Sequence, residues 1–209
     1  MHEQSKVAAE VPPTRVDGVR SRPVIAIDGP AGAGKSTLAV VAGSAGGGMV
    51  FHSDDTVGVM GEGQVAGQMA GLMAGLMAGK VAGMPFGVAI REGSWGVVGA
   101  RVKEFVGLEE CERFGQRVKF VGSGVRESLA VAAVAMVFPR FVAGSGGMRV
   151  RELGQLEMLT GLQESGFWVP HTREGIAFFL EWVGGMPGYA VEYSEVDEVV
   201  GFLRGLAEK

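Results

Sequence analysis

The chain is short of cysteine and of positive charge, and each shortage excludes a class of function. Its 209 residues include one cysteine, Cys111, so no disulfide can form within the chain. The formal net charge of −4 argues against broad binding to nucleic acid or to an anionic membrane surface. The three histidines and Cys111 lack the spacing of a zinc site. No charged and then apolar leader precedes the first predicted strand, so we expect a cytoplasmic protein.

Glycine, in contrast, is abundant, with 36 residues. Within "GQVAGQMAGLMAGLMAGKVAGM" glycine recurs at every fourth position, from Gly67 to Gly83. This period is close to one helical turn and favours a weak soluble helix or a low-complexity segment. A membrane-spanning pair of glycine-striped helices is the alternative, but Gln64, Gln68 and Lys80 interrupt the segment. We therefore expect no membrane partner.

The order of elements predicts an α/β fold. Residues 1–22 are polar and are expected to form a disordered tail, and residues 23–209 a single domain with the Gly/Met-rich segment at 61–87. "VIAI" at 24–27 predicts a strand buried on both faces, followed by a helix from about Gly34. "GMVFHSDD" is the second strand candidate. Strand, helix and strand in this order are typical of α/β architecture with right-handed crossovers.

Further along the chain the patterns predict several helices and strands. Helices are expected over residues 99–114, 128–138 and 150–162, the second ending before Pro139 because a residue that precedes proline disfavours helical dihedrals. A short strand is expected at 117–121 and a buried strand at 175–182. The last segment, 194–209, reads as an amphipathic helix that Ser194 could cap, with Asp197 at its third position. Its apolar stripe is expected in the core: Val196, Val199, Val200 and Leu203.

The strongest motif for chemistry is "GPAGAGKS", residues 29–36, which fits the Walker A pattern G-x-x-x-x-G-K-S between a strand and a helix. Glycines let backbone N–H groups point at a phosphate, and the helix N-terminus adds partial positive charge. The lysine would contact the outer phosphates and the serine hydroxyl would bind Mg²⁺. The segment therefore predicts binding of a nucleotide phosphate by Gly29, Pro30, Ala31, Gly32, Ala33, Gly34, Lys35, Ser36 and Thr37.

Two carboxylates, Asp54 and Asp55, follow the second strand candidate. The carboxyl ends of strands are where open α/β sheets bind ligands. Asp54 could hold magnesium-bound water, and either residue could contact a substrate hydroxyl. An Asp-rich turn that caps a helix explains the pair equally well.

The segment "IAIDGPAGAGKSTLA", residues 25–39, resembles the opening of bacterial cytidylate kinases. Four later segments are similar in the same order: "DDTVGVM", "SGVRESLAVAAVAMVFPR", "FWVPHTREGIAFFLEW" and "YAVEYSEVDEVVGFLRGL". The resemblance implies a P-loop NTPase fold, a three-layer α/β/α sandwich with a mostly parallel central sheet. It also implies transfer of the ATP γ-phosphoryl group to CMP or dCMP, with Mg²⁺. We expect a monomer whose partner is a small nucleotide, with no nucleic acid.

The same resemblance suggests roles for residues in this sequence. Lys35 would act in catalysis, Asp55 would lie in the monophosphate pocket, and Ser123 would approach the base. Arg126 and Arg140 are the candidates for the acceptor phosphate, although each is equally well explained as a solvated charge at a helix end.

Several family features are missing. Gly61 follows Met60 where the family has an arginine, Gly161-Leu162-Gln163 replaces its Gly-Arg-Asp, and "VGGMPG" replaces its arginine-rich lid. Two alternatives therefore stay open. One is a phosphotransferase for a hydroxyl acceptor, with Asp54 or Asp55 as base. The other is a degenerate nucleotide-binding protein without turnover.

Overall fold

The computed structural model describes residues 24–44, 49, 57–60, 80–83, 87–122, 131–167 and 172–208. The strands in these ranges are β1 (Val24–Ile27), β2 (Val57–Met60), β3 (Lys80–Gly83), β4 (Val88–Arg91), β5 (Glu110–Arg113), β6 (Gln116–Val121), β7 (Val131–Phe141), β8 (Arg149–Leu153) and β9 (Gly188–Tyr193). The helices are α1 (Lys35–Ser44), α2 (Trp95–Gly99), α3 (Gln155–Glu164), α4 (Arg173–Gly184) and α5 (Val196–Ala207), with short 3-10 turns η2 (Glu92–Ser94) and η3 (Lys103–Gly107).

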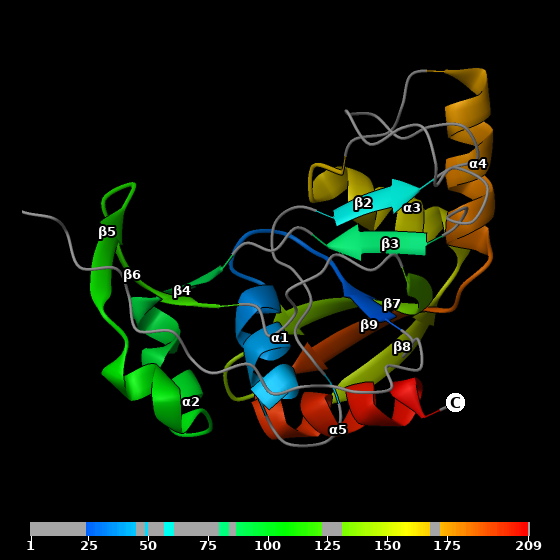
Figure 1. Ribbon diagram of the computed structural model, residues 1–209. Coiled ribbons are helices and arrows are strands. Elements are labelled where there is room, and N and C mark those ends of the chain that lie inside the picture. The colour runs from blue at the N-terminus through cyan, green and yellow to red at the C-terminus, as the bar shows by residue number, and fades with distance from the viewer. Residues whose placement is uncertain are drawn as a thin grey trace, which may run out of the picture.

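The larger sheet is built around β7, and its centre is parallel (Figure 1). β1 and β9 both pair with β7 in parallel, and β8 pairs antiparallel with β9. β3 pairs antiparallel with the first residues of β7, and β2 pairs with β3. Three of the four neighbouring strands β1-β7-β9-β8 therefore point the same way, so their carboxyl ends meet at one edge of the sheet.

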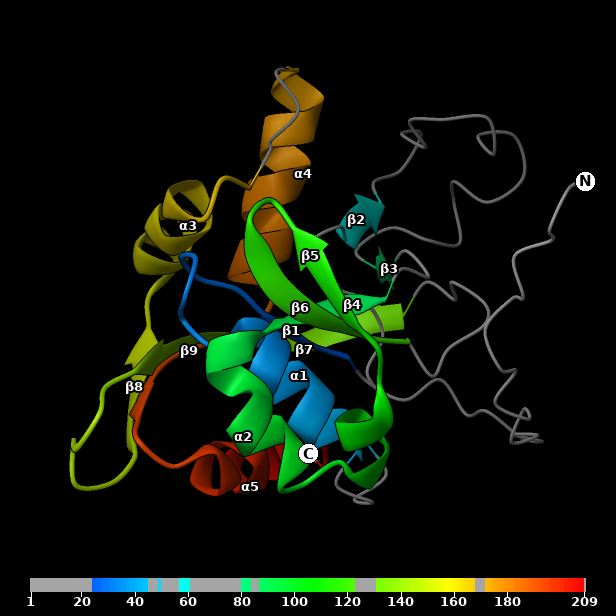
Figure 2. The ribbon, with the colours of Figure 1, turned by 90° about the vertical axis from the view of Figure 1, so that its left-hand side faces the viewer.

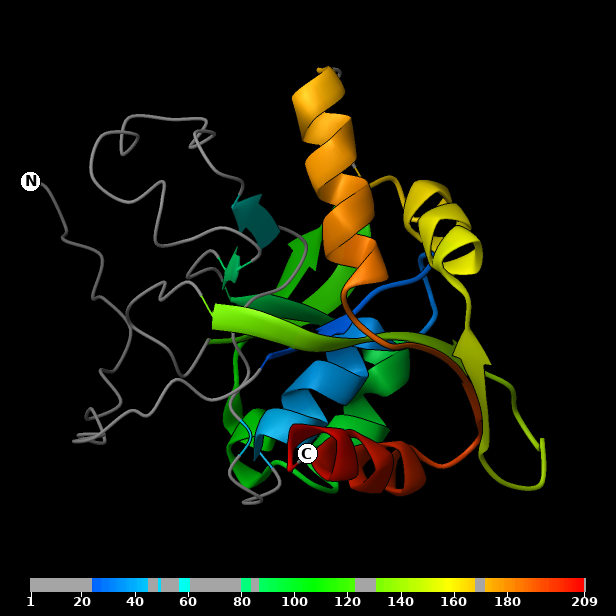
Figure 3. The same cartoon turned by 90° about the vertical axis from the view of Figure 1, so that its right-hand side faces the viewer.

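Helices cover both faces of this sheet (Figure 3). On one face α1 and α5 pack over alternate residues of the strands, including Val137 and Val191, both at most 1% exposed. On the other face α3 and α4 bury Met136 under Leu162, Phe179 and Trp182. This is a mixed α/β architecture with a mostly parallel central sheet, compatible with the predicted three-layer sandwich.

A smaller antiparallel sheet, β4-β6-β5, stands beside the α1 face (Figure 2). Val88 and Ile90 of β4 pack in the same apolar cluster as Leu38 and Val41 of α1. The predicted strand at 117–121 is confirmed as β6. The predicted helix over 99–114 is wrong. α2 ends at Gly99, and a hairpin joins β5 to β6 through Phe114 and Gly115, both with positive φ as a two-residue turn requires.

The largest correction concerns the segment predicted as a helix over residues 128–138, because its described part belongs to β7. Alanine-rich composition favours a helix locally, but Ala135, Met136 and Val137 are each at most 1% exposed. These residues alternate between the two apolar clusters, so both faces of the strand are buried. Burial on both faces removes the polar alternation that marks a strand and leaves an apolar run.

Pro139 lies inside β7 without losing a hydrogen bond of the sheet. The Met136 N–H donates to Pro187 O on the β9 side, and the Asp28 N–H donates to Val137 O on the β1 side. Odd-numbered residues of β7 therefore face β1, which ends at Ile27 opposite Val137. The nitrogen of Pro139 points past the end of β1, where no partner strand is lost.

Three smaller expectations also need correction. Residues 175–182 lie in α4, not a strand, because Thr172 Oγ1 accepts the Gly175 N–H at 3.0 Å as an N-cap. The predicted helix at 150–162 begins only after β8. Ser194 does not cap α5, whose N-cap is Glu195 without a side-chain bond, and Asp197 is the second helical residue. The predicted α5 stripe is confirmed as buried.

Other predictions fall mainly outside the described residues. These are the tail at 1–22, nearly all of the second strand candidate, and the glycine repeat up to residue 79. The described end of that repeat, Lys80–Gly83, is strand β3 and not a helix. β1 matches its prediction in position, but its side chains are only half-buried. In the described ranges no helix is both long enough and apolar enough to cross a membrane.

Candidate functional site

The glycine loop, residues 28–34, joins the carboxyl end of β1 to the first residue of α1. Gly29, Gly32 and Gly34 have φ values of 143°, 86° and 90°, which L-residues with side chains rarely adopt. The first amides of α1 have no partner within the helix and face the loop. The local sequence therefore produces what the motif predicts, a turn of left-handed glycines that leads into a helix N-terminus.

Lys35 reaches back across this loop. Its ammonium donates hydrogen bonds to the carbonyl oxygens of Gly29 at 2.5 Å and Pro30 at 3.1 Å. The positive charge of Lys35 thus lies over the first turn of the loop. An anion bound on the loop amides would lie beside this charge and at the positive end of the α1 dipole.

Tyr193, the last residue of β9, supports the loop from below. It is 1% exposed, and its hydroxyl donates a hydrogen bond to the Ala33 carbonyl oxygen, 3.4 Å away. A Cβ on Gly34 would overlap that hydroxyl oxygen. Burial raises the pKa of Tyr193 to about 12, because ionisation would place a phenolate in the apolar interior. Glycine is therefore required at position 34 for two reasons, the positive φ of the backbone and the Tyr193 hydroxyl that leaves no room for a Cβ.

Asp28 fixes the entrance of the loop. One carboxylate oxygen accepts the Gly29 N–H at 2.7 Å, and the other lies 2.7 Å from the Ser165 hydroxyl just after α3. The loop is thus attached to the helical layer on the opposite face of the sheet from α1. Sequence reasoning gave Asp28 no role, although its place directly before Gly29 was visible.

The two hydroxyls that follow Lys35 differ in their surroundings. Thr37 is 9% exposed, and its hydroxyl donates to Ser94 Oγ at 3.0 Å, which ties α1 to η2, the turn that follows β4. Ser36 is half-buried in the first turn of α1, the position that the motif gives to a magnesium ligand. The described residues contain no cluster of three acidic, histidine or cysteine side chains, and Asp54, the other predicted metal ligand, lies outside them.

Among the other predicted site residues, only Arg140 lies in the described part of the chain. Asp54, Asp55, Ser123 and Arg126 fall outside it. Arg140 is near the end of β7, one residue after Pro139, whose carbonyl oxygen would be 3.7 Å from a Cβ on Gly29. The structure thus brings Arg140 to the edge of the sheet that carries the glycine loop. Arg140 is 77% exposed and pairs with Glu192 at 3.5 Å.

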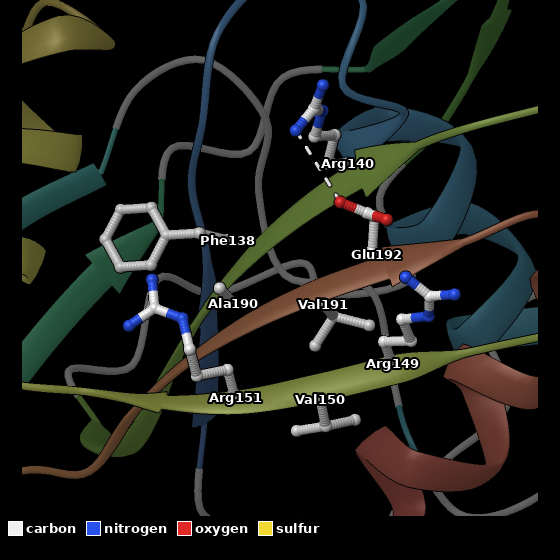
Figure 4. A pocket seen from close by; sticks show the side chains of 8 residues that line it. All are labelled: Phe138, Arg140, Arg149, Val150, Arg151, Ala190, Val191 and Glu192. Atoms are coloured by element: carbon white, nitrogen blue, oxygen red, sulfur yellow. Dashed lines mark ion pairs between the residues drawn. The ribbon is translucent and has the colours of Figure 1, made fainter. Parts of the chain in front are cut away.

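A groove of about 300 Å³ opens beside Arg140 on the face of the sheet that carries α3 and α4 (Figure 4). We call it the arginine groove. Neither motif nor resemblance pointed to the two arginines of β8, because Arg151 was assigned to the helix predicted over 150–162 and Arg149 to no element. The alternation of arginine and valine in "RVREL" is the period of a strand and could have revealed them. The side chains on this face are Phe138, Arg140, Arg149, Arg151, Ala190 and Glu192.

Comparison of the chain with protein-family models, with curated proteins and with solved structures finds no match. The site is therefore interpreted from its own geometry and from the resemblance of residues 25–39.

Proposed function

We propose that this protein transfers the γ-phosphoryl group of ATP to a nucleoside monophosphate, with CMP or dCMP as the preferred acceptor. The observation that carries the proposal is the glycine loop, with three left-handed glycines between β1 and α1 and the Lys35 ammonium folded across them. The preference for a cytidine nucleotide rests on the resemblance of residues 25–39 alone.

The roles of the residues follow from charge and position. The loop amides and the N-terminus of α1 would bind the β- and γ-phosphates, and Lys35 would balance charge that develops on the transferred group. Magnesium, when bound to the nucleotide at the Ser36 hydroxyl, would supply further charge neutralisation. Arg140 follows Pro139, the residue of β7 that lies beside Gly29, and would contact the acceptor.

A monophosphate acceptor removes the need for a general base. An oxygen of the ionised acceptor phosphate attacks the γ-phosphorus, a new P–O bond forms, and the bond to ADP breaks. ATP with four negative charges and CMP with two give ADP and CDP with three each, so no proton is released. An alcohol acceptor would release one. Asp28 is the described carboxylate beside the loop, and both of its oxygens already accept hydrogen bonds. The carboxylates predicted as the base for an alcohol acceptor, Asp54 and Asp55, lie outside the described residues.

The test follows conversion of ATP to ADP with CMP, dCMP, UMP and AMP in turn. Lys35→Ala is the loss variant, and Lys103→Ala is its control because Lys103 is an exposed lysine on η3. We expect acceptor-dependent ADP from the wild type and from Lys103→Ala, and at least about a hundredfold less from Lys35→Ala.

Three results would contradict the proposal. ADP formation that no nucleotide stimulates would remove the kinase assignment. Stimulation by a neutral nucleoside or sugar, but by no monophosphate, would instead favour the hydroxyl-acceptor phosphotransferase. Unchanged ATP affinity in Lys35→Ala would contradict the role of the glycine loop itself.

A further inference from the structure

The strand register places three arginines on one face of the sheet. Arg140 of β7 is opposite Glu192 of β9, and Glu192 is opposite Arg149 of β8. Two residues earlier in β7 and β9 and two residues later in the antiparallel β8, Phe138, Ala190 and Arg151 form the next row. Since side chains alternate along a strand, both rows point away from α1 and α5. Figure 4 shows these side chains gathered along the same groove.

The groove carries an excess of positive charge in a chain whose net charge is −4. Two carboxylates face its three guanidinium groups. Glu192 lies 3.5 Å from Arg140, and Glu157 of α3 accepts from Arg151 at 2.6 Å. Arg149 has no ion-pair partner among the residues that the structure describes. A fork of N–H donors without a carboxylate partner is suited to a phosphate.

α3 connects the groove to the glycine loop. Near its start, Glu157 contacts Arg151, and just after its end, Ser165 contacts Asp28. Between these contacts Gly161 lies against Phe138, so close that a Cβ on Gly161 would be 2.7 Å from the ring. Eight residues of helix separate the two contacts, or roughly 12 Å at 1.5 Å per residue. The groove thus begins within the length of a nucleotide from the loop.

We propose that Arg149 and Arg151 of β8 form, together with Arg140, a binding site for a phosphomonoester dianion. In this site Arg140 and Arg149 hold the phosphate from two sides, and Arg151 adds charge next to Phe138. As an acceptor subsite the inference rests on the proposed phosphoryl transfer, but binding in the groove can be measured without any transfer. The Arg140 guanidinium is exposed, and its 3.5 Å contact with the half-buried Glu192 is long enough for a phosphate to replace the carboxylate as its partner.

The experiment measures binding of CMP, ribose 5-phosphate and cytidine by calorimetry to the full chain. Because the glycine loop can also bind phosphate, each titration is run in a Lys35→Ala background and again with a non-hydrolysable ATP analogue and Mg²⁺. The test variant is Arg149→Gln/Arg151→Gln. The matched control is Arg113→Gln, an exposed arginine on β5 in the small sheet.

We expect the double variant to bind CMP and ribose 5-phosphate at least about tenfold more weakly, as loss of charge-assisted hydrogen bonds predicts. Its affinity for the ATP analogue should stay within twofold, and Arg113→Gln should match the wild type. Cytidine, which lacks the phosphate, should bind weakly and equally to all variants. Glu192→Gln should strengthen CMP binding about threefold, because it removes the carboxylate that competes for Arg140.

Several outcomes would overturn the inference. Among them are unchanged CMP affinity in Arg149→Gln/Arg151→Gln, equal losses for CMP and cytidine, and no phosphomonoester binding in the Lys35→Ala background. If the double variant fails to fold, Glu192→Gln decides the question. Weaker or unchanged CMP binding in Glu192→Gln would contradict the idea that the Glu192 carboxylate competes with the phosphate for Arg140. If phosphomonoesters bind in the groove but no acceptor stimulates ADP formation, the proposed kinase function is wrong and the proposed binding site still stands.

Discussion

The glycine loop and the arginine groove lie at the same edge of the central sheet but are built from different parts of the chain. The loop is one continuous segment that leads into the N-terminus of α1 and is held from below by the buried Tyr193. The groove is assembled by the register of β7, β9 and β8 and presents long side chains, of which Arg140 is 77% exposed.

This difference has consequences for how each region responds to change. The loop depends on glycines with positive φ and on close contact between Gly34 and the buried Tyr193. Even an added methyl group at Gly34 must therefore displace either the loop or Tyr193. The groove depends on exposed charges that salt screens and that neighbouring arginines partly replace. We therefore expect large, nearly all-or-none effects in the loop and graded, salt-dependent effects in the groove.

The largest expected effect comes from Gly34→Ala. The new Cβ would overlap the Tyr193 hydroxyl and would also occupy a φ of 90° that favours glycine. We expect a loss of about 3 kcal/mol in the free energy of unfolding, from the strained backbone and the overpacked core together. Binding of the ATP analogue should fall by at least about tenfold, while CMP binding in the groove should change little. Urea unfolding and calorimetry measure the two quantities.

A matched pair of variants separates the two causes in Gly34→Ala. Gly32 has a φ of 86° but open space around its Cβ position, so Gly32→Ala should cost only the backbone strain, about 1 kcal/mol. Tyr193→Phe removes the overlapping oxygen, and the remaining Cζ would be 3.5 Å away. Gly34→Ala/Tyr193→Phe should thus be more stable than Gly34→Ala alone by about 1–2 kcal/mol. Simple additivity of the two substitutions would contradict this account.

The next effect is a loss of stability in alkali through Tyr193. Its pKa is raised to about 12 in the folded protein, against about 10 in an unfolded chain. A raised pKa means that its stabilising contribution is complete below pH 10 and is lost as the pH rises from 10 to 12. The loss should approach about 1.4 kcal/mol per pH unit and about 3 kcal/mol in total.

The measurement compares the unfolding free energy of the wild type and of Tyr193→Phe between pH 8 and pH 11. Lysine titration affects both proteins, so only their difference reports on Tyr193. The wild type should lose stability more steeply above pH 10. If the unfolding free energies of the two proteins fall in parallel above pH 10, the pKa of Tyr193 is not raised, and its hydroxyl is not buried beneath the loop.

The contrast between the regions also explains what the sequence could predict. The loop was predictable because strand, glycines, lysine and helix are consecutive from Val24 to Ser44, and local rules fix each step. The groove was not, because its residues become neighbours only through pairing between β7, β9 and β8. Two local errors concealed it: the apolar, alanine-rich run of β7 was predicted as a helix although both of its faces are buried, and most of β8 was included in the helix predicted over 150–162. Local propensity loses to such burial.

The smallest expected effect on stability, but a specific one on the groove, comes from Gly161→Ala in α3. Alanine favours a helix over glycine by up to about 1 kcal/mol, but here its Cβ would be 2.7 Å from the Phe138 ring. Gly201→Ala in α5 is the control because nothing lies near its Cβ position. Gly201→Ala should raise the free energy of unfolding by about 0.5–1 kcal/mol and change no affinity, whereas Gly161→Ala should not raise it.

Because Phe138 lines the groove, Gly161→Ala should alter CMP affinity several-fold and leave the affinity for the ATP analogue unchanged. If both affinities changed together, the loop and the groove would not be separable sites, and α3 would couple them through Ser165 and Asp28.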